Sequence, residues 1–424
     1  MAKVNLIAGM DIGSGKITAV SAYMDQETGK LKVVAGVVVP CEGLREGIVT
    51  NIKQVSSAVA NVIRQLEEKS GGQDLRGLYI ALRGEHLQSM KSQGSYNISR
   101  VDKEVTAEDI KRVLENASGV SIKSDNEIVN VIPQGFTIDK QQRGIPNPEG
   151  MVAYTSLEVD VYIVTGHSSA LMNLRKPIEN IGLRIDDTYY SLMCLCDNVL
   201  RKEEKQLGAI LIDLGGQTIS VGICADGILQ YSKEFNFGCD LVTSDIAAAF
   251  NTSTANAQKI KEESGLCFPN YNEAEQEEEV QVPSLDGKTI TPFKKTILLD
   301  IIQPRMQEFF EAVRDCIIES DLSDLITRGV ITGGGSAMPG IESLASQVLG
   351  VKEIHRGLIP RDFVDAEEEL FDSKYTTAIS LLLYVTKREV FDQKKESEMV
   401  SKSPIMKVCK NFFKKIVNSE IFGG

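Results

Sequence analysis

The stretch VNLIAGMDIGSGKITAV, residues 4–20, decides the fold class of this chain. A short apolar run leads into Asp11, a glycine-rich turn follows, and an alternating run begins at Ile17. A second turn at 27–30 then leads into the apolar run LKVVAGVVV. Alternating or apolar runs separated by short glycine turns are typical of strands. The stretch therefore predicts a strand, a tight hairpin, a second strand, a turn and a third strand.

The same order of features returns in GAILIDLGGQTISVGI, residues 208–223. An apolar run leads into Asp213, a glycine pair follows, and a turn at 225–227 precedes the run ILQYSKEF. Each copy is followed by a plausibly helical segment, at 51–69 and at 240–264. Two matching strand-rich halves with covering helices predict a duplicated α/β fold.

The glycine turns predict a phosphate-binding site. Glycine leaves backbone N–H groups unobstructed, permits positive φ and lets phosphate oxygens approach closely. We expect these roles for two glycines in each hairpin, namely Gly13, Gly15, Gly215 and Gly216. Ser14 and Thr218 can donate hydrogen bonds to the same oxygens, and Lys16 adds a positive charge for the β- or γ-phosphate. A third turn, Gly333-Gly334-Gly335, would let the backbone approach a flat ring or the α-phosphate.

Asp11 and Asp213, which end the first strand of each copy, predict a metal ion. A carboxylate beside phosphate needs a cation between them, and Mg²⁺ usually retains several of its waters. We therefore expect Mg²⁺ to be held by these two residues, through water. The chain lacks the Walker spacing GxxxxGK[ST], because Ile17 follows Lys16 where that motif has Ser or Thr.

Composition narrows the class of protein. The chain has 424 residues, 42% hydrophobic and 25% charged, as in an ordinary soluble globular protein with room for several domains. Its net charge of −13 argues against a nucleic-acid partner. The eight cysteines are scattered without a CxxC pair, which argues against structural zinc and favours reduced thiols. The apolar run near the N-terminus is too short for a signal peptide or a spanning helix.

The segments around the two copies have distinct characters. Residues 85–162 predict a small α+β insertion, whose helix opens with a capping-box pattern at Thr106 and Asp109. The remaining segments are two helical pieces in 163–205, a loop-rich part at 266–296 with an acidic run at 273–279, a helix at 303–320, an apolar helix at 376–388 and a polar linker at 389–403.

The order of hairpin, inserted segment, second hairpin and late glycine turn resembles the actin, Hsp70 and sugar-kinase superfamily. Within it the chain resembles the FtsA family of bacterial division proteins, which tether FtsZ filaments to the membrane. The resemblance spans essentially the whole chain. Its carrying stretches are IAGMDIGSGKITA, GLREGIVTNI, LYIALRGEHL, VIPQGFTID, GAILIDLGGQTISVGI, LVTSDIAAAF and GVITGGGSAMPGIESLA.

This resemblance implies an actin-like, ribonuclease H-like fold with two lobes around a nucleotide cleft. The implied subdomains are IA (1–84, 164–193 and 374–388), IC (85–163), IIA (194–240 and 300–373) and IIB (241–299). ATP would lie between IA and IIA. Lys261 lies where a contact to adenosine is expected, and Gly238, Ser336 and Met338 are expected beside the nucleotide.

The chain departs from the family pattern at two places. Gln217 stands where the second hairpin usually has a third glycine, and it would either crowd the γ-phosphate or hydrogen-bond to it. The stretch TYYSLMCLCDNVL lacks a Gln or Glu placed to orient an attacking water. We therefore expect ATP binding with weak or negligible hydrolysis, and we assign no catalytic residue.

The C-terminal tail, residues 404–420, predicts an amphipathic membrane-targeting helix after the linker. At 100° per residue its apolar and basic side chains fill opposite halves of the wheel, and Pro404 suits the first turn. Residues 401–424 hold five Lys and one Glu, net +4, which leaves −17 on the rest because the total is −13. Such a helix lies on an anionic bilayer; the alternative is a helix docked on the protein itself or on a partner. The side chains expected at the membrane are Ile405, Met406, Lys407, Val408, Cys409, Lys410, Phe412, Phe413, Lys414, Lys415, Ile416 and Val417.

The resemblance also implies partners and a location. The segment 241–299 would bind the C-terminal peptide of FtsZ, and the segment 85–163 would contact neighbouring subunits or other division proteins. The protein would form filaments on the cytoplasmic side of the bacterial inner membrane, at the septum. Two alternatives stay open: an actin-like scaffold of type IV pilus assembly, and a small-molecule kinase, for which the chain shows no base or sugar-pocket motif.

Overall fold

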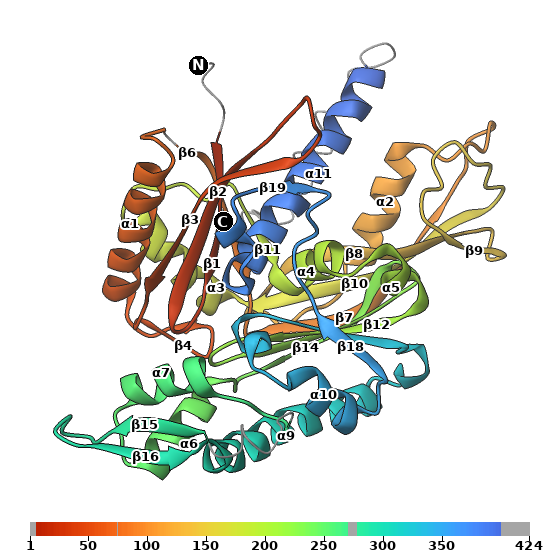
Figure 1. Ribbon diagram of the computed structural model, residues 1–424. Coiled ribbons are helices and arrows are strands. Elements are labelled where there is room, and N and C mark those ends of the chain that lie inside the picture. Colours follow the sequence, from red (N-terminus) through yellow and green to blue (C-terminus); the bar gives the residue numbers. More distant parts are fainter. Residues whose placement is uncertain (1–5, 74, 270–277, 400–424) are drawn as a thin grey trace.

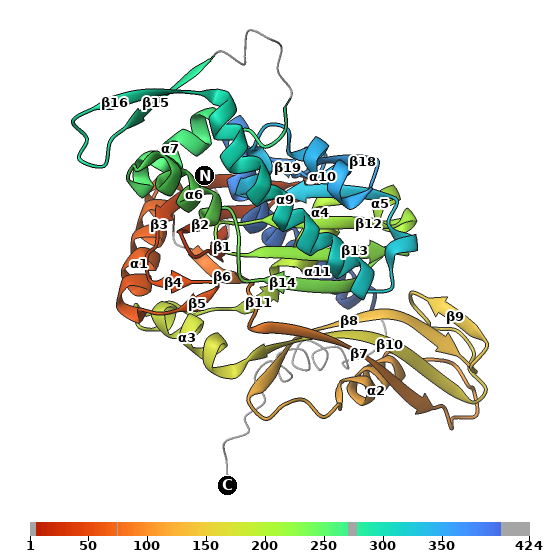
Figure 2. The same cartoon turned by 90° about the horizontal axis from the view of Figure 1, so that it is seen from below.

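The computed structural model describes residues 6–73, 75–269 and 278–399 (Figure 1). Two mixed sheets with covering helices form two lobes, and a third sheet projects from their side (Figure 2). The fold is α/β and duplicated, as predicted.

Lobe I is built on a sheet with the strand order β11-β6-β1-β2-β3-β19. The first three strands of the chain form an antiparallel meander, and β6 and β11 continue the sheet in parallel beside β1. The bounds are β1 Leu6–Ile12, β2 Lys16–Met24, β3 Leu31–Pro40, β6 Leu75–Leu82, β11 Asp187–Tyr190 and β19 Val364–Asp365.

Lobe II repeats this pattern in the order β14-β13-β12-β17-β18. Again the first three strands form an antiparallel meander and the last two run parallel beside the first. The bounds are β12 Ala209–Leu214, β13 Ile219–Ala225, β14 Ile228–Phe235, β17 Arg328–Thr332 and β18 Glu353–Arg356. The identical order and direction of five strands confirm the internal duplication.

Helices separate and cover the two sheets. Helices α4 and α11 lie between the sheets and share one apolar core with both (Figure 1). Helices α1 and α3 cover the outer side of lobe I, and α6, α9 and α10 cover that of lobe II. The bounds are α1 Ile52–Lys69, α3 Ser168–Glu179, α4 Ser191–Val199, α5 Lys202–Leu207, α6 Asp240–Phe250, α9 Lys295–Glu319, α10 Ile341–Leu349 and α11 Thr376–Met399.

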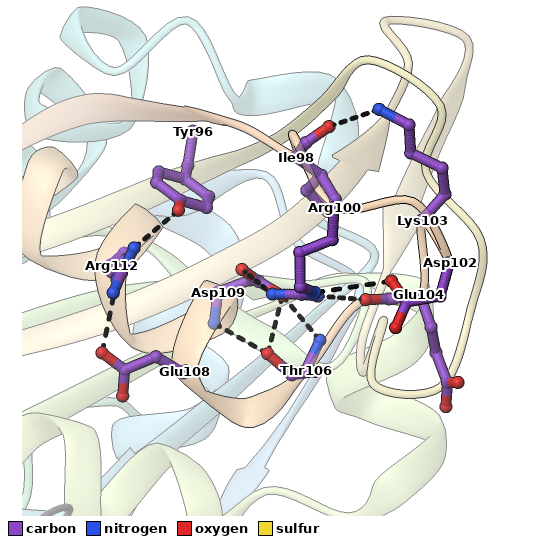
Figure 3. Close-up of polar contacts among 10 residues, drawn as sticks. All are labelled: Tyr96, Ile98, Arg100, Asp102, Lys103, Glu104, Thr106, Glu108, Asp109 and Arg112. Atoms are coloured by element: carbon purple, nitrogen blue, oxygen red, sulfur yellow. Dashed lines mark hydrogen bonds and ion pairs between the residues drawn. The ribbon is translucent and has the colours of Figure 1, made fainter.

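The insertion forms its own α+β unit, the IC subdomain, with the strand order β7-β10-β8-β9. Helix α2 packs on this sheet so closely that a Cβ on Gly94 would lie 2.2 Å from the carbonyl oxygen of Val113. The predicted capping box is confirmed: Thr106 and Asp109 cap each other, and Arg100 pairs with Asp109 at 2.6 Å (Figure 3). The bounds are β7 Leu87–Asn97, α2 Ala107–Ser118, β8 Asn126–Ile138, β9 Gln142–Ile145 and β10 Ser156–His167.

The loop-rich interpretation of 266–296 was wrong for part of that segment. It contains a hairpin, β15 Glu279–Pro283 paired with β16 Ile290–Lys294, beside helix α7 Thr254–Ser264. The polar turn Asp286-Gly287 allows this reversal, because glycine adopts the positive φ of 68° found there. Most of the predicted acidic run, residues 273–277, lies outside the described residues.

Three further expectations need correction. The segment 163–205 was predicted to hold two helical pieces, but it contains α3, α4 and the start of α5, and the short strand β11 lies between α3 and α4. The helix predicted to begin at 303 begins at Lys295, so Pro304 is inside it and the predicted IIB–IIA boundary falls within α9. Strand β19 pairs with β3 in lobe I, so the chain returns to that lobe before the predicted boundary at 374.

The predicted linker was wrong for residues 389–399, which continue helix α11 to Met399. Glu, Lys and Gln are good helix formers, and extending a helix that tertiary packing has already nucleated adds a hydrogen bond per residue. Residues 400–403 and the predicted amphipathic helix at 404–420 lie outside the described residues. Within the described ranges, no helix combines the length and apolar character needed to cross a bilayer.

The remaining short elements complete the lobes. They are β4 Leu44–Arg45, β5 Ile48–Val49, η1 Ser323–Leu325, η2 Gly334–Ala337, η3 Glu368–Phe371 and η4 Ser373–Tyr375.

Candidate functional site

The two predicted hairpins have the same geometry. Asp11 pairs with Thr18 across β1 and β2, and Asp213 pairs with Ser220 across β12 and β13. Each turn is closed by one backbone hydrogen bond of 2.9 Å, from Gly13 to Lys16 and from Gly215 to Thr218. The equivalence follows from the duplication, since each hairpin joins the first two strands of its sheet.

The expectation that the hairpin glycines adopt positive φ was wrong. None of Gly13, Gly15, Gly215 and Gly216 has a positive φ. Close packing explains Gly215, because a Cβ there would lie 2.7 Å from the carbonyl oxygen of Thr218. Gly15 differs, because its Cβ would meet no atom within 4 Å. The space beside Gly15 is therefore open to a ligand.

The third glycine turn lies against both hairpins. Gly333 has a φ of 82°, and a Cβ on it would lie 2.2 Å from Oδ1 of Asp213. A Cβ on Gly334 would lie 3.9 Å from Nζ of Lys16, so the lysine of the first hairpin reaches the third turn. The Ser336 hydroxyl closes this turn by donating to the Gly333 carbonyl, and Met338 is buried in the lobe II core.

A short turn of lobe I, Glu46-Gly47, joins the two hairpins. The Gly47 N–H donates to the Ser14 hydroxyl at 3.1 Å, and the Glu46 N–H donates to Oε1 of Gln217 at 3.0 Å. The Gln217 amide then donates to Asp240 at 3.2 Å. The unusual Gln217 therefore makes a hydrogen bond between the lobes.

Gly238 and Lys261 lie on the lobe II side of the hairpins. A Cβ on Gly238 would lie 2.7 Å from the carbonyl oxygens of Gly215 and Gly216, so this glycine supports the second hairpin. The Lys261 ammonium is half-buried and donates to the Thr243 hydroxyl at 2.7 Å. Burial lowers the pKa of Lys261.

Arg83, which sequence reasoning missed, lies between the two predicted metal ligands. It follows β6, and its guanidinium contacts Asp11 of lobe I at 2.9 Å and Asp213 of lobe II at 3.3 Å. The exposed fractions of these three side chains are 10%, 14% and 1%. Burial disfavours the charged guanidinium, but the surrounding carboxylates outweigh burial and raise the pKa of Arg83.

The duplication could have identified Arg83 as a site residue, because equivalent strand positions in the two lobes can be compared. Ala81 pairs with Asp11, and Thr332 pairs with Asp213 in the other lobe. Arg83, two residues after Ala81, is therefore the counterpart of Gly334, which is already part of a predicted phosphate turn.

Asp11 and Asp213 fit a hydrated cation. Oδ1 of Asp11 and both carboxylate oxygens of Asp213 are buried without a hydrogen-bond partner. Buried carboxylate oxygens normally have partners. Oδ2 of Asp213 faces the Arg83 guanidinium at 3.3 Å, whereas Oδ1 of Asp11 and Oδ1 of Asp213 can accept from metal-bound waters. No group of three or more His, Cys, Asp or Glu side chains that could hold a metal occurs in the described part of the chain.

Glu234 of β14 is a buried carboxylate behind this site. It accepts hydrogen bonds from the Tyr190 and Ser220 hydroxyls, each at 2.8 Å, and from the Gly84 N–H at 3.1 Å. Burial raises the pKa of Glu234 to about 6, although these donors and Arg83 act against the increase.

Replacing Glu234 with Gln should change how stability depends on pH. Because the folded pKa of about 6 exceeds the ordinary 4.5, wild-type stability falls as pH rises from 4.5 to about 6. Gln cannot ionise, so the free energy of unfolding of the variant should rise by about 2 kcal/mol relative to that of wild type across this window. The substitution can also shift the free energy of unfolding by a constant amount at every pH. Urea unfolding of both proteins at several pH values measures how this difference in stability changes with pH. The exposed Glu85→Gln is the control, and a constant difference for Glu234→Gln would contradict the prediction.

The arrangement of duplicated lobes, paired hairpins and a third glycine turn defines the actin-like class of proteins. Solved structures agree. A PilM–PilN type IV pilus biogenesis complex matches with a TM-score of 0.64 at 16% identity, over 90% of this chain and 98% of the other. MreB 5 of Spiroplasma citri matches with a TM-score of 0.51 at 11% identity, over 94% and 99%. These likenesses show the fold alone.

Family comparisons are more specific. The family described as "Cell division protein FtsA" matches residues 210–380, and the "SHS2 domain inserted in FTSA" matches 84–165. Cell division protein FtsA of Borreliella burgdorferi is 31% identical over 97% of this chain and 98% of the relative. Those of Pseudomonas aeruginosa and Escherichia coli K12 are 30% and 28% identical, over 89% of this chain and 89% and 90% of theirs. The chain belongs to the FtsA family of cell division proteins.

Proposed function

We propose that this protein binds Mg-ATP between its two hairpins and anchors FtsZ filaments to the cytoplasmic face of the bacterial inner membrane at the septum. The observation that carries the proposal is membership of the FtsA division family over nearly the whole chain. In this proposal the protein self-associates into filaments, so that many C-terminal helices act on one membrane surface.

Nucleotide binding is supported by the meeting of three glycine turns and Lys16. Backbone N–H groups of Gly15 and Gly216 would face phosphate oxygens, because the Gly13 N–H already donates to the Lys16 carbonyl, and the third turn would approach the nucleotide from lobe II. Asp11 and Asp213 would hold Mg²⁺, which would neutralise phosphate charge. MreB 5, which shares the fold, is described as bound to AMPPNP.

We expect slow or negligible ATP turnover. The segment after the IC subdomain forms β11 and α4 and offers no Gln or Glu for orienting a water. Glu234, the buried carboxylate behind the hairpins, already accepts three hydrogen bonds. An acceptor that is satisfied in this way is poorly placed to act as a base.

The hairpin β15–β16 in the segment 241–299 is our candidate for the FtsZ peptide. Leu285 in its turn and Ile290 at the start of β16 are 66% and 63% exposed. A two-stranded sheet also leaves edges that an extended peptide can pair with. The IC subdomain remains the proposed contact for neighbouring subunits and other division proteins.

The proposal is tested by reconstitution. FtsZ filaments should collect on anionic vesicles when this protein and Mg-ATP are present. Replacing both Leu285 and Ile290 with Ser should reduce FtsZ recruitment by about tenfold or more, since two exposed apolar contacts are lost. Co-sedimentation measures both FtsZ and this protein in the pellet.

Val101→Ser is the matched control, because Val101 is a fully exposed apolar residue of the IC subdomain. The paired Ser variant should still bind vesicles and nucleotide. Unchanged FtsZ recruitment by that variant would refute the hairpin as the peptide site, and no recruitment by wild type would refute the function.

A further inference from the structure

Arg83 is the cation that the structure places where both lobes present a buried carboxylate. Its Nη2 donates to Asp11 at 2.9 Å and to the Thr377 hydroxyl of α11 at 3.0 Å. Its Nη1 lies 3.3 Å from Asp213. A planar guanidinium can contact two carboxylates at once, which an ammonium does less well.

The local charge requires a cation at this position. Asp11, Asp213 and Glu234 all act electrostatically on Arg83. Lys16 also acts electrostatically on Asp11, but it is exposed at the tip of the first hairpin. Buried carboxylates are costly without a partner, so removing the charge of Arg83 leaves a site that should attract another cation.

The comparison between lobes shows that this strand end can be formed without an arginine. The counterpart of Arg83 in lobe II is Gly334, which is exposed and open. The same strand end is therefore built with an arginine in one lobe and without a side chain in the other. This difference points to a role at the site itself.

We propose that Arg83 is the built-in counter-cation of the nucleotide site, and that it competes with a divalent cation for Asp11 and Asp213. The proposal rests on nucleotide binding at this site. Its consequence is that nucleotide binding by this chain depends only weakly on Mg²⁺, because Arg83 already neutralises the carboxylates that would otherwise repel phosphate.

The first experiment uses the metal alone, on the full chain without nucleotide. Arg83→Gln removes the charge and leaves a shorter polar side chain, and Arg83→Lys retains the charge. Mn²⁺ binding, followed by electron paramagnetic resonance, should be about tenfold tighter or more for Arg83→Gln than for wild type. Arg83→Lys should bind Mn²⁺ more weakly than Arg83→Gln does, because it keeps a cation beside the two carboxylates.

Stability provides a second readout without nucleotide. Mg²⁺ should raise the thermal unfolding midpoint of Arg83→Gln, and leave those of wild type and Arg83→Lys nearly unchanged. If Arg83→Gln folds only when Mg²⁺ is present, that result also supports the proposal. Failure of Mg²⁺ to stabilise it, with no gain in Mn²⁺ binding, would overturn it.

The third experiment measures a fluorescent ATP analogue with Mg²⁺ and with EDTA. Chelation should weaken binding by less than about tenfold in wild type and by about a hundredfold in Arg83→Gln. Equal dependence on Mg²⁺ in both proteins would refute the role of Arg83. Absence of nucleotide binding by wild type would instead refute the proposed function. The Mn²⁺ experiment would still decide whether Arg83 competes with a divalent cation or is only a structural ion pair.

Arg100→Gln in the IC subdomain is the matched control. Arg100 also pairs with a buried carboxylate, Asp109 at 2.6 Å, but outside the nucleotide site (Figure 3). Its replacement should lower stability without changing Mn²⁺ binding or the Mg²⁺ dependence of nucleotide binding. If Arg83→Gln behaved like Arg100→Gln in all three measurements, Arg83 would be a structural ion pair only.

Discussion

Removal of residues 401–424 is expected to release the protein from anionic vesicles and to leave nucleotide binding intact. The tail carries a net charge of +4 and an expected apolar half-wheel, and it follows helix α11, which the structure describes as far as Met399. An interfacial helix of this kind binds through buried apolar area and through attraction to anionic lipid. Vesicle co-sedimentation of the full-length and truncated proteins measures the loss.

Both halves of the expected helix should contribute to membrane binding. Changing Phe412 and Phe413 to Glu removes two anchors that are worth roughly 1.5–3 kcal/mol each when fully buried. Changing the basic set to Gln removes about 1 kcal/mol per charge, and only this part should weaken with added salt. The basic set is Lys407, Lys410, Lys414 and Lys415.

Vesicles of neutral lipid are the control for the charged half, because the lysine variants and the parent should bind them equally. Nucleotide binding by the truncated protein is the control for folding. Equal sedimentation of the full-length and truncated proteins with anionic vesicles would mean that the helix docks on the protein or on a partner.

Replacing Gly15 with Val should abolish ATP binding with little change in the unfolding midpoint. A Cβ at Gly15 meets no atom within 4 Å, and the residue does not have a positive φ, so the side chain is not strained in the free protein. The added volume would occupy the space that we assign to phosphate. Isothermal calorimetry and thermal unfolding separate the two effects.

Two other glycines make this prediction specific. Gly119→Val in the IC subdomain is the control, because its Cβ would meet only ordinary contacts at 3.5 Å or more. Gly215→Val should lose both binding and stability, because its Cβ would lie 2.7 Å from a backbone oxygen. ATP binding by Gly15→Val at wild-type affinity would show that phosphate lies elsewhere.

Local pattern predicted the parts of the fold that are encoded within short stretches. The hairpins after Asp11 and Asp213, the third turn at 333–335 and the capping box at Thr106 all depend on neighbours within a few residues. The linker prediction failed over residues 389–399 for the opposite reason. The polar composition of this segment has no periodicity, and helix α11 continues into it because a packed helix precedes it.

The amino-acid sequence by itself determined the duplicated α/β architecture and the three glycine turns, and it predicts the segregation of basic and apolar residues in the tail. Each of these is a repeat, a turn or a periodicity, and each is set by steric and hydrophobic preferences of adjacent residues. Only the tertiary structure decided which side chains contact one another between the lobes. Arg83, Asp11 and Asp213 are far apart in the chain, as are Glu46 and Gln217. Their contacts arise because parallel strand ends and hairpins from two sheets converge, and burial then makes unpaired charge costly enough to fix Arg83 between the two carboxylates.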